Sequence, residues 1–216
     1  MTGMARTVAW GILIALGLLL IVNTVPYFSF RREFAFLEEK GPLVADPVWR
    51  RCFYGHLLGS VACLLLIPFL FWNRLLRRSP GLHRWLGRCY GVAVLGWAAP
   101  TGLYLSFHAK GGLAGKSAFL LLGVLWWATT ARGVQTAVAR RFDEHRRWMI
   151  RSAAIAGSAI YFRVFHLALF GLGLPDESNY ALSLWLSAAT SLIAGEAFGR
   201  GVPAEPPSVA WKGEVS

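Results

Sequence analysis

Two ionisable side chains lie in a stretch of sequence that is too apolar for water. Arg163 and His166 occur within residues 149–172, which read MIRSAAIAGSAIYFRVFHLALFGL. Because they are three residues apart, both side chains are expected to project from one face of a helix. Charged groups at membrane depth are costly and mark functional sites by default. This pair is therefore the first candidate for chemistry.

His56 is predicted to lie level with His166 on a different membrane helix. Each is about five residues inside the outer end of its span, at ~1.5 Å per residue. Neutral imidazole is a common axial ligand of haem iron, and helix bundles hold cofactors between facing helices. The first hypothesis is a b-type haem at this outer site, with His56 and His166 as iron ligands and Arg163 neutralising a propionate or setting the potential. The alternative is a buried polar cluster that joins helices through hydrogen bonds.

A second and weaker candidate site lies near the inner ends of the spans. His83 and His145 are also level there, with Arg88 and Arg151 nearby. The first possibility is again haem ligation, although the outer pair lies deeper in the hydrocarbon. The second is an anionic lipid headgroup or a quinone-like molecule, because basic pockets between inner helix ends bind phospholipid heads. Glu196 is predicted at the depth of Arg151, where an ion pair is favoured over a proton relay.

The elements that position these residues are membrane helices. Of the 216 residues, 56% are hydrophobic and only 15% are charged, whereas soluble proteins carry about 25% charged residues. Each apolar run approaches the ~20 residues that a membrane helix needs, and helices are required because lipid offers the backbone no partner. The six runs are Trp10–Phe30, Cys52–Trp72, Trp85–Phe107, Ser117–Val138, Met149–Leu172 and Tyr180–Phe198.

The net charge of +11 is explained by membrane topology. With the N-terminus in the cytoplasm, most lysines and arginines fall on the inner side, as the positive-inside rule requires. We therefore predict an all-α bundle of six transmembrane helices with both termini cytoplasmic, in the inner membrane of a bacterium. Because the basic loops already have this explanation, no nucleic-acid partner is predicted.

Short loops predict an up-and-down arrangement of neighbouring helices in one membrane domain over residues 1–200. Pro26, Pro68 and Pro100 are expected to kink or open their helices. Residues 201–216 are rich in proline, and we predict a disordered cytoplasmic tail.

Two segments resemble a known family. HRWLGRCY at 83–90 and HRRWMIRS at 145–152 are similar to motifs that open two membrane helices in an uncharacterised bacterial family of multi-pass membrane proteins, domain of unknown function 2306. In that family a histidine early in an upstream span corresponds to His56, and an arginine later in the fifth span corresponds to Arg163. The resemblance covers about residues 50–165 and implies a topology rather than a reaction.

Three functional hypotheses follow. The first is a membrane redox component that binds haem or a quinone. The second is a small transporter in which Arg163 binds an anion and His56 titrates, and the three prolines would suit its broken helices. The third is a non-catalytic assembly factor. Neither a G-x-S-x-G nor an H-E-x-x-H motif occurs, so hydrolase chemistry has little support.

Overall fold

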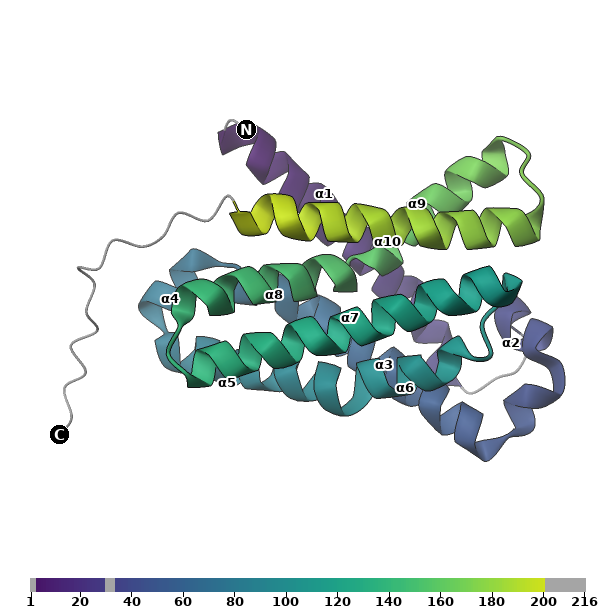
Figure 1. The fold of residues 1–216 in the computed structure, drawn as a ribbon, viewed down its shortest axis with the longest axis horizontal. Coiled ribbons are helices and arrows are strands. Elements are labelled where there is room, and N and C mark those ends of the chain that lie inside the picture. Colours follow the sequence, from purple (N-terminus) through teal and green to yellow (C-terminus); the bar gives the residue numbers. More distant parts are fainter. Residues whose placement is uncertain (1–2, 30–33, 201–216) are drawn as a thin grey trace.

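The computed structural model describes residues 3–29 and 34–200, which form helices joined by short turns (Figure 1). These described residues contain no strand. The predicted disordered tail at 201–216 lies outside the described ranges. The elements in chain order are α1 (Gly3–Thr24), η1 (Val25–Ser29), α2 (Ala35–Lys40), η2 (Gly41–Ala45), α3 (Pro47–Leu70), α4 (Asn73–Arg78), α5 (Pro80–Val92), η3 (Ala93–Ala98), α6 (Ala99–Ser106), α7 (Gly112–Val138), α8 (Phe142–Ala156), α9 (Ser158–Gly171) and α10 (Asp176–Arg200).

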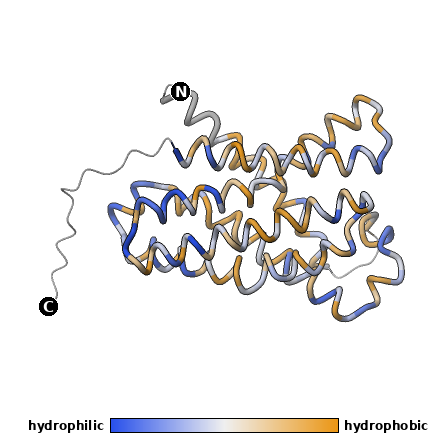
Figure 2. The backbone as a smooth tube through the Cα atoms, viewed as in Figure 1, coloured by the Kyte–Doolittle hydropathy of each residue, from blue (hydrophilic) through white to orange (hydrophobic). Residues whose placement is uncertain are grey.

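Several described segments are long and apolar enough to cross a membrane. The five are Gly11–Ser29, Pro47–Leu70, Gly112–Val138, Phe142–Gly171 and Asp176–Arg200. Hydrophobic residues fill the middle of the bundle, and hydrophilic ones gather toward its ends (Figure 2). The all-helical, multi-pass class is therefore confirmed. The predicted third span is divided among α5, η3 and α6, each too short to cross alone, and the sixth crossing and the sidedness of the termini stay predictions.

Pro100 accounts for the break in the third span. Proline has no N–H, and its ring crowds the carbonyl group one turn earlier in a helix. Just before it the backbone widens into the π-helix η3, whose end is marked by the bond from the Ala99 N–H to the Val94 carbonyl oxygen. Short π-helical segments inside longer helices often occur at functional sites.

The fifth span is also broken near its middle. α8 ends at Ala156 and α9 begins at Ser158, with Gly157 between them. α9 then diverges from the direction of α8 (Figure 1). The other prolines behave differently, because Pro26 lies in η1 just after α1 and Pro68 lies inside α3 without ending it. Two of the six predicted spans thus change helix type or direction near their middles.

α10 packs against α7, α8 and α9 through a stripe of small side chains. The members of the stripe are spaced four residues apart, so they lie on one face of the helix, and all of them are buried. In lipid the hydrophobic effect does not drive helices together, so their association depends on van der Waals packing. Small residues favour this packing because they let the helix backbones approach closely. The members are Asn179, Ser183, Ser187, Ser191, Gly195 and Gly199.

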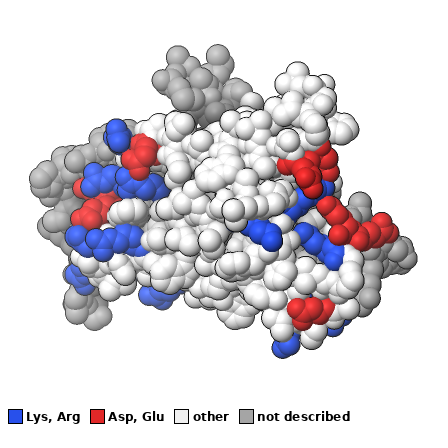
Figure 3. All heavy atoms as spheres, turned by 45° about the vertical axis from the view of Figure 1, so that its right-hand side comes forward, with Lys and Arg blue, Asp and Glu red and all other residues white. Residues whose placement is uncertain are grey.

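Charged side chains gather at the two ends of the bundle (Figure 3). We call the end formed by α4, the start of α5 and the α7–α8 turn the arginine-rich end. We call the opposite end, formed by α2, the α6–α7 turn and the α9–α10 turn, the roof end. At the roof end, α2 packs on the start of α3 through aromatic side chains. The Phe53 ring stacks on Trp49 at 5.1 Å and on Phe36 at 5.8 Å between ring centroids.

Candidate functional site

A cavity of about 340 Å³ lies in the half of the bundle nearer the roof end. This volume falls within the roughly 300–1,000 Å³ typical of small-molecule sites. Its walls come from α1, α2, α3, α6, α7, α9 and α10, together with the breaks in the third and fifth spans. The lining is mainly apolar but includes Lys40, His56, His108 and Arg163, and it contains no aspartate or glutamate. The two helix breaks therefore open onto a cationic cavity.

His56 is fixed on the cavity wall by the π-helix. Its Nδ1 lies 2.7 Å from the carbonyl oxygen of Ala98. A carbonyl only accepts, so Nδ1 carries the proton and the unprotonated Nε2 remains as an acceptor, with the Ser60 hydroxyl at 3.5 Å. Gly102 makes room for the ring, because a Cβ at this position would lie 2.8 Å from the imidazole Nδ1.

Arg163 of α9 lines the cavity and has no carboxylate partner among the described residues. Its guanidinium donates to the Ala159 carbonyl oxygen at 2.9 Å. A guanidinium keeps its charge in proteins and has five N–H donors. One backbone acceptor leaves most of these donors and the whole charge available to a ligand.

Two further donors at the roof end were missed by sequence reasoning. The indole of Trp49 is only 1% exposed, lines the cavity, and its Nε1 has no hydrogen-bond partner. Buried polar groups are rarely left unpaired, and each exception calls for an explanation. Lys40 also lines the cavity, where its Nζ donates to the His108 carbonyl oxygen at 2.7 Å. Burial lowers the pKa of Lys40, although the neighbouring Glu39 opposes the shift.

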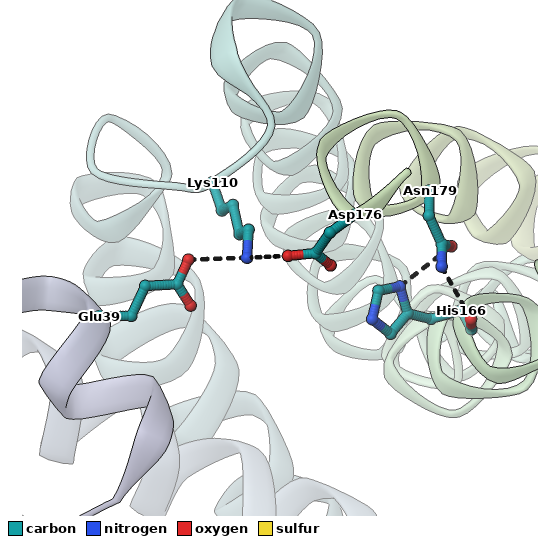
Figure 4. A network of polar contacts seen from close by, with 5 residues as sticks. All are labelled: Glu39, Lys110, His166, Asp176 and Asn179. Carbon is teal, nitrogen blue, oxygen red and sulfur yellow. Dashed lines mark hydrogen bonds and ion pairs between the residues drawn. The ribbon is translucent and has the colours of Figure 1, made fainter. Parts of the chain in front are cut away.

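His166 lies in the interface between α9 and α10 and is not among the residues that line the cavity. Its Nδ1 is 3.1 Å from Asn179 Oδ1, while the Asn179 Nδ2 donates to the His166 carbonyl oxygen at 3.2 Å (Figure 4). Its ring also stacks on Phe162 at 5.4 Å between centroids. The structure therefore brings His56 and Arg163 to one cavity but ties His166 to α10. The pairing of His56 with His166 on one iron stays a prediction.

A charged network fastens the roof end beside this site. Lys110, in the α6–α7 turn, contacts Glu39 of α2 at 2.8 Å and Asp176 of α10 at 2.6 Å (Figure 4). These two hydrogen bonds raise the pKa of Lys110 above its ordinary value. The network joins three segments that are distant in sequence and holds α2 against the bundle.

At the arginine-rich end, the structure brings His83 and His145 near each other. Tyr90 and Ser152, each seven residues after one of these histidines, share a hydrogen bond of 2.8 Å between their hydroxyls. Burial lowers the pKa of His83, and the charge of His145 adds to this shift. His145 Nδ1 donates to the Gly133 carbonyl oxygen at 2.8 Å, whereas His83 Nδ1 is buried without a partner. Haem ligation by His83 and His145 stays a prediction.

Arg151 is held in an ion pair between α8 and α10. Its guanidinium makes two bonds to Glu196, at 2.6 and 3.2 Å, and lies over the Trp148 ring at 4.6 Å. The predicted ion pair with Glu196 is therefore present. Arg88 remains exposed on α5. The ion pair of Arg151 with Glu196 holds α8 against α10. That Arg88 and Arg151 form one ligand site with His83 and His145 stays a prediction.

A family described as predicted membrane protein (DUF2306) matches residues 53–198, and the chain belongs to this family. No curated protein and no solved structure matches the chain. The matched region contains His56 and Arg163 on the cavity wall and the histidine pair at the arginine-rich end. It excludes α1, Lys40 and Trp49, which complete the cavity from the N-terminal side.

Proposed function

We propose that this family member is a redox component of a bacterial inner membrane that binds a quinone in the cavity. The observation that carries the proposal is a wall of hydrogen-bond donors without any acidic side chain. Trp49 lies on the cavity wall with an indole N–H that is buried without a partner, and Arg163 offers a charge without a carboxylate partner among the described residues. A quinone ring is apolar on its faces and carries two acceptor oxygens, which suits a cavity of this kind.

The cavity residues would also favour reduction of the bound ring. Reduction to the quinol takes up two protons and two electrons, the electrons coming from a separate reduced electron-transfer protein in the membrane, and charge builds on the oxygens before the protons arrive. A guanidinium in a site shielded from water stabilises such charge strongly. His56, once protonated at Nε2, would carry a proton on the same wall. These roles need no metal ion in the cavity.

Equilibrium binding of a tailless benzoquinone to the purified protein tests the proposal. Trp49→Phe keeps an aromatic ring but removes the N–H, and Arg163→Met keeps much of the stem but removes the charge. A lost hydrogen bond to a charged group is worth roughly 1.5–3 kcal/mol, or about 10–100-fold in Kd. We expect a loss of this size for Arg163→Met and a smaller loss for Trp49→Phe.

Matched controls come from exposed residues outside the cavity, Trp97→Phe on η3 and Arg132→Met on α7. These variants should bind like the natural chain. Absence of binding to the natural chain, or equal binding by all four variants, would reject the proposal. Binding of a fatty-acid anion in place of the quinone, lost in Arg163→Met, would instead favour the anion carrier.

Haem is a second candidate, favoured by how the histidine rings are held. Metal-bound histidines commonly fix one ring nitrogen on an oxygen acceptor and present the other to the metal. Both His56 and His166 have Nδ1 placed against an oxygen, which leaves Nε2 for coordination. An absorbance spectrum of the purified protein decides this point. A Soret band that is lost in His56→Ala and His166→Ala would support haem, and its absence after haem supplementation would reject it.

A further inference from the structure

The cavity is lined by residues of both α1 and α9, and the gap between these two helices is the candidate site for an apolar tail. α1 supplies Leu20, Ile21 and Thr24 to the cavity lining. Outside the chain-adjacent η1, α1 packs mainly on α3 and α9. It comes near α9 at Gly17, where a Cβ would lie 3.8 Å from Cδ1 of Ile160. On the roof side of this crossing the two helices border the cavity.

Arg163 lies one turn beyond this crossing and marks the mouth of the gap. It lines the cavity, yet its side chain remains exposed. The surfaces on both sides of the mouth are apolar. Val164 and Leu167 on α9 are 48% and 71% exposed, and Leu18 on α1 is 51% exposed. Since these helices belong to membrane-crossing segments, the mouth faces hydrocarbon rather than water.

Two other sides of the cavity are covered by described residues. The roof is covered by α2, whose Phe36 and Lys40 line the cavity, and the network of Glu39, Lys110 and Asp176 holds that roof to α10. Toward the arginine-rich end, the bundle is filled by a buried cluster that includes Cys63, Tyr90 and Val94. Neither of these sides offers a path to lipid for a chain longer than the ring of a quinone, whereas the gap between α1 and α9 is bordered by apolar surface on both helices.

We propose that the gap between α1 and α9 is a tail-binding subsite, and that the ligand is a long-tailed, membrane-dissolved molecule which enters from the bilayer with its polar head inside. This inference rests on the proposed function for the identity of the head. The volume of about 340 Å³ supports it, because a head group fills a cavity of this size while a long tail must lie outside. Arg163, at the mouth, would contact the junction of head and tail.

Binding of two matched probes tests the subsite. One is the dimethoxy-methyl-benzoquinone ring without a tail, and the other is the same ring with a decyl tail. In the natural chain the tailed probe should bind at least about tenfold more tightly in the same detergent. Ile21→Trp, which fills the α1 side of the gap, should remove this advantage, so that the two probes bind this variant with equal affinity. Leu19→Trp on the lipid side of α1 is the matched control and should preserve the advantage.

The outcomes separate the two proposals. Equal binding of both probes by the natural chain would overturn the subsite while leaving the quinone proposal intact. Absence of binding by either probe would overturn both. A decyl probe with a diazirine at the tail end gives an independent check, because photolysis should label residues 17–24 or 158–164. Labelling confined to α2 or to the arginine-rich end would also overturn the subsite.

Discussion

At the scale of single residues, oxygen acceptors set the direction in which the histidine rings point. His56 donates to the Ala98 carbonyl and His145 to the Gly133 carbonyl, while His166 is held by the Asn179 amide. In each case Nδ1 is used by the protein and Nε2 is left over. Such anchoring reduces the freedom of a ring before a ligand arrives, which favours tight binding.

The fit of Gly102 against His56 gives a first prediction. Gly102→Ala would place a Cβ 2.8 Å from Nδ1 of the ring, so the ring must move and its bond to Ala98 must weaken. Overpacking typically costs about 1–3 kcal/mol, and thermal unfolding in detergent should show a lower midpoint. Gly96→Ala is the control, because no atom lies within 4 Å of the added Cβ. In a His56→Ala background the Gly102→Ala effect should largely disappear, and full additivity would contradict the account.

His83 gives a prediction about pH. Its pKa lies below the ordinary 6.5, first because of burial and then because of His145. The unfolded chain therefore binds this proton at a higher pH than the folded chain does, and folding stability falls as pH decreases below about 6.5. The loss levels off below the lowered pKa. Unfolding midpoints between pH 7.5 and 5 should fall less in His83→Gln than in the natural chain, with His108→Gln as the control. An identical pH profile in His83→Gln would contradict this.

At the scale of elements, close packing supports the two broken spans. η3 lies against α3 at Gly59, where a Cβ would be 3.0 Å from the Ala98 Cβ and 3.1 Å from its backbone nitrogen. Ala98 also carries the carbonyl that holds His56. The position of the π-helix and the orientation of the ring are therefore coupled through one residue.

Gly59→Ala tests this coupling. The new Cβ meets backbone as well as a side chain, so α3 and η3 must separate by a few tenths of an ångström. We expect a lower unfolding midpoint together with several-fold weaker quinone binding, because His56 loses its anchor. Gly81→Ala, in the first turn of α5 with no atom within 4 Å of its added Cβ, should change neither quantity. A stable Gly59→Ala variant that binds quinone normally would show that ligand binding does not depend on the packing of the π-helix against α3.

The same elements show what the sequence predicts well. Five of the six predicted spans match helical segments that are long and apolar enough to cross a membrane. They are visible in the sequence because exposure to lipid makes hydrophobicity nearly continuous along such helices. Pro100 indicated a disruption, since its missing N–H is a local property. The break at Gly157 was not predicted, because glycine is common in membrane helices and carries no such local signal.

At the scale of the whole molecule, the candidate site was predicted only in part. Arg163 and His56 were found because ionisable residues are rare at membrane depth. Trp49 and Lys40 were missed, since tryptophan and lysine near a span end normally serve as interfacial anchors. Their role at the cavity depends on how α2 folds back over α3, which is a property of tertiary packing. The same reason explains why the attachment of His166 to Asn179 was not foreseen.

The arrangement of the whole bundle also bears on the side from which a ligand reaches the cavity. The roof end is closed by α2 and the Lys110 network, while α1 leaves one side open to lipid. The positive-inside rule predicts that the arginine-rich end faces the cytoplasm, and this orientation would place the cavity in the outer half of the membrane. A ligand in this position would exchange with the outer leaflet and not with the cytosol.

The central claim is that one ligand head occupies the space between His56 and Arg163. A crystal structure of the protein with a brominated benzoquinone tests it most directly, because bromine is located by anomalous scattering without a prior assumption about the site. We expect an anomalous peak inside the cavity, with a ring oxygen within hydrogen-bond distance of the Arg163 guanidinium. Saturating quinone with no peak in the cavity, or a peak only at the lipid-facing surface, would contradict it.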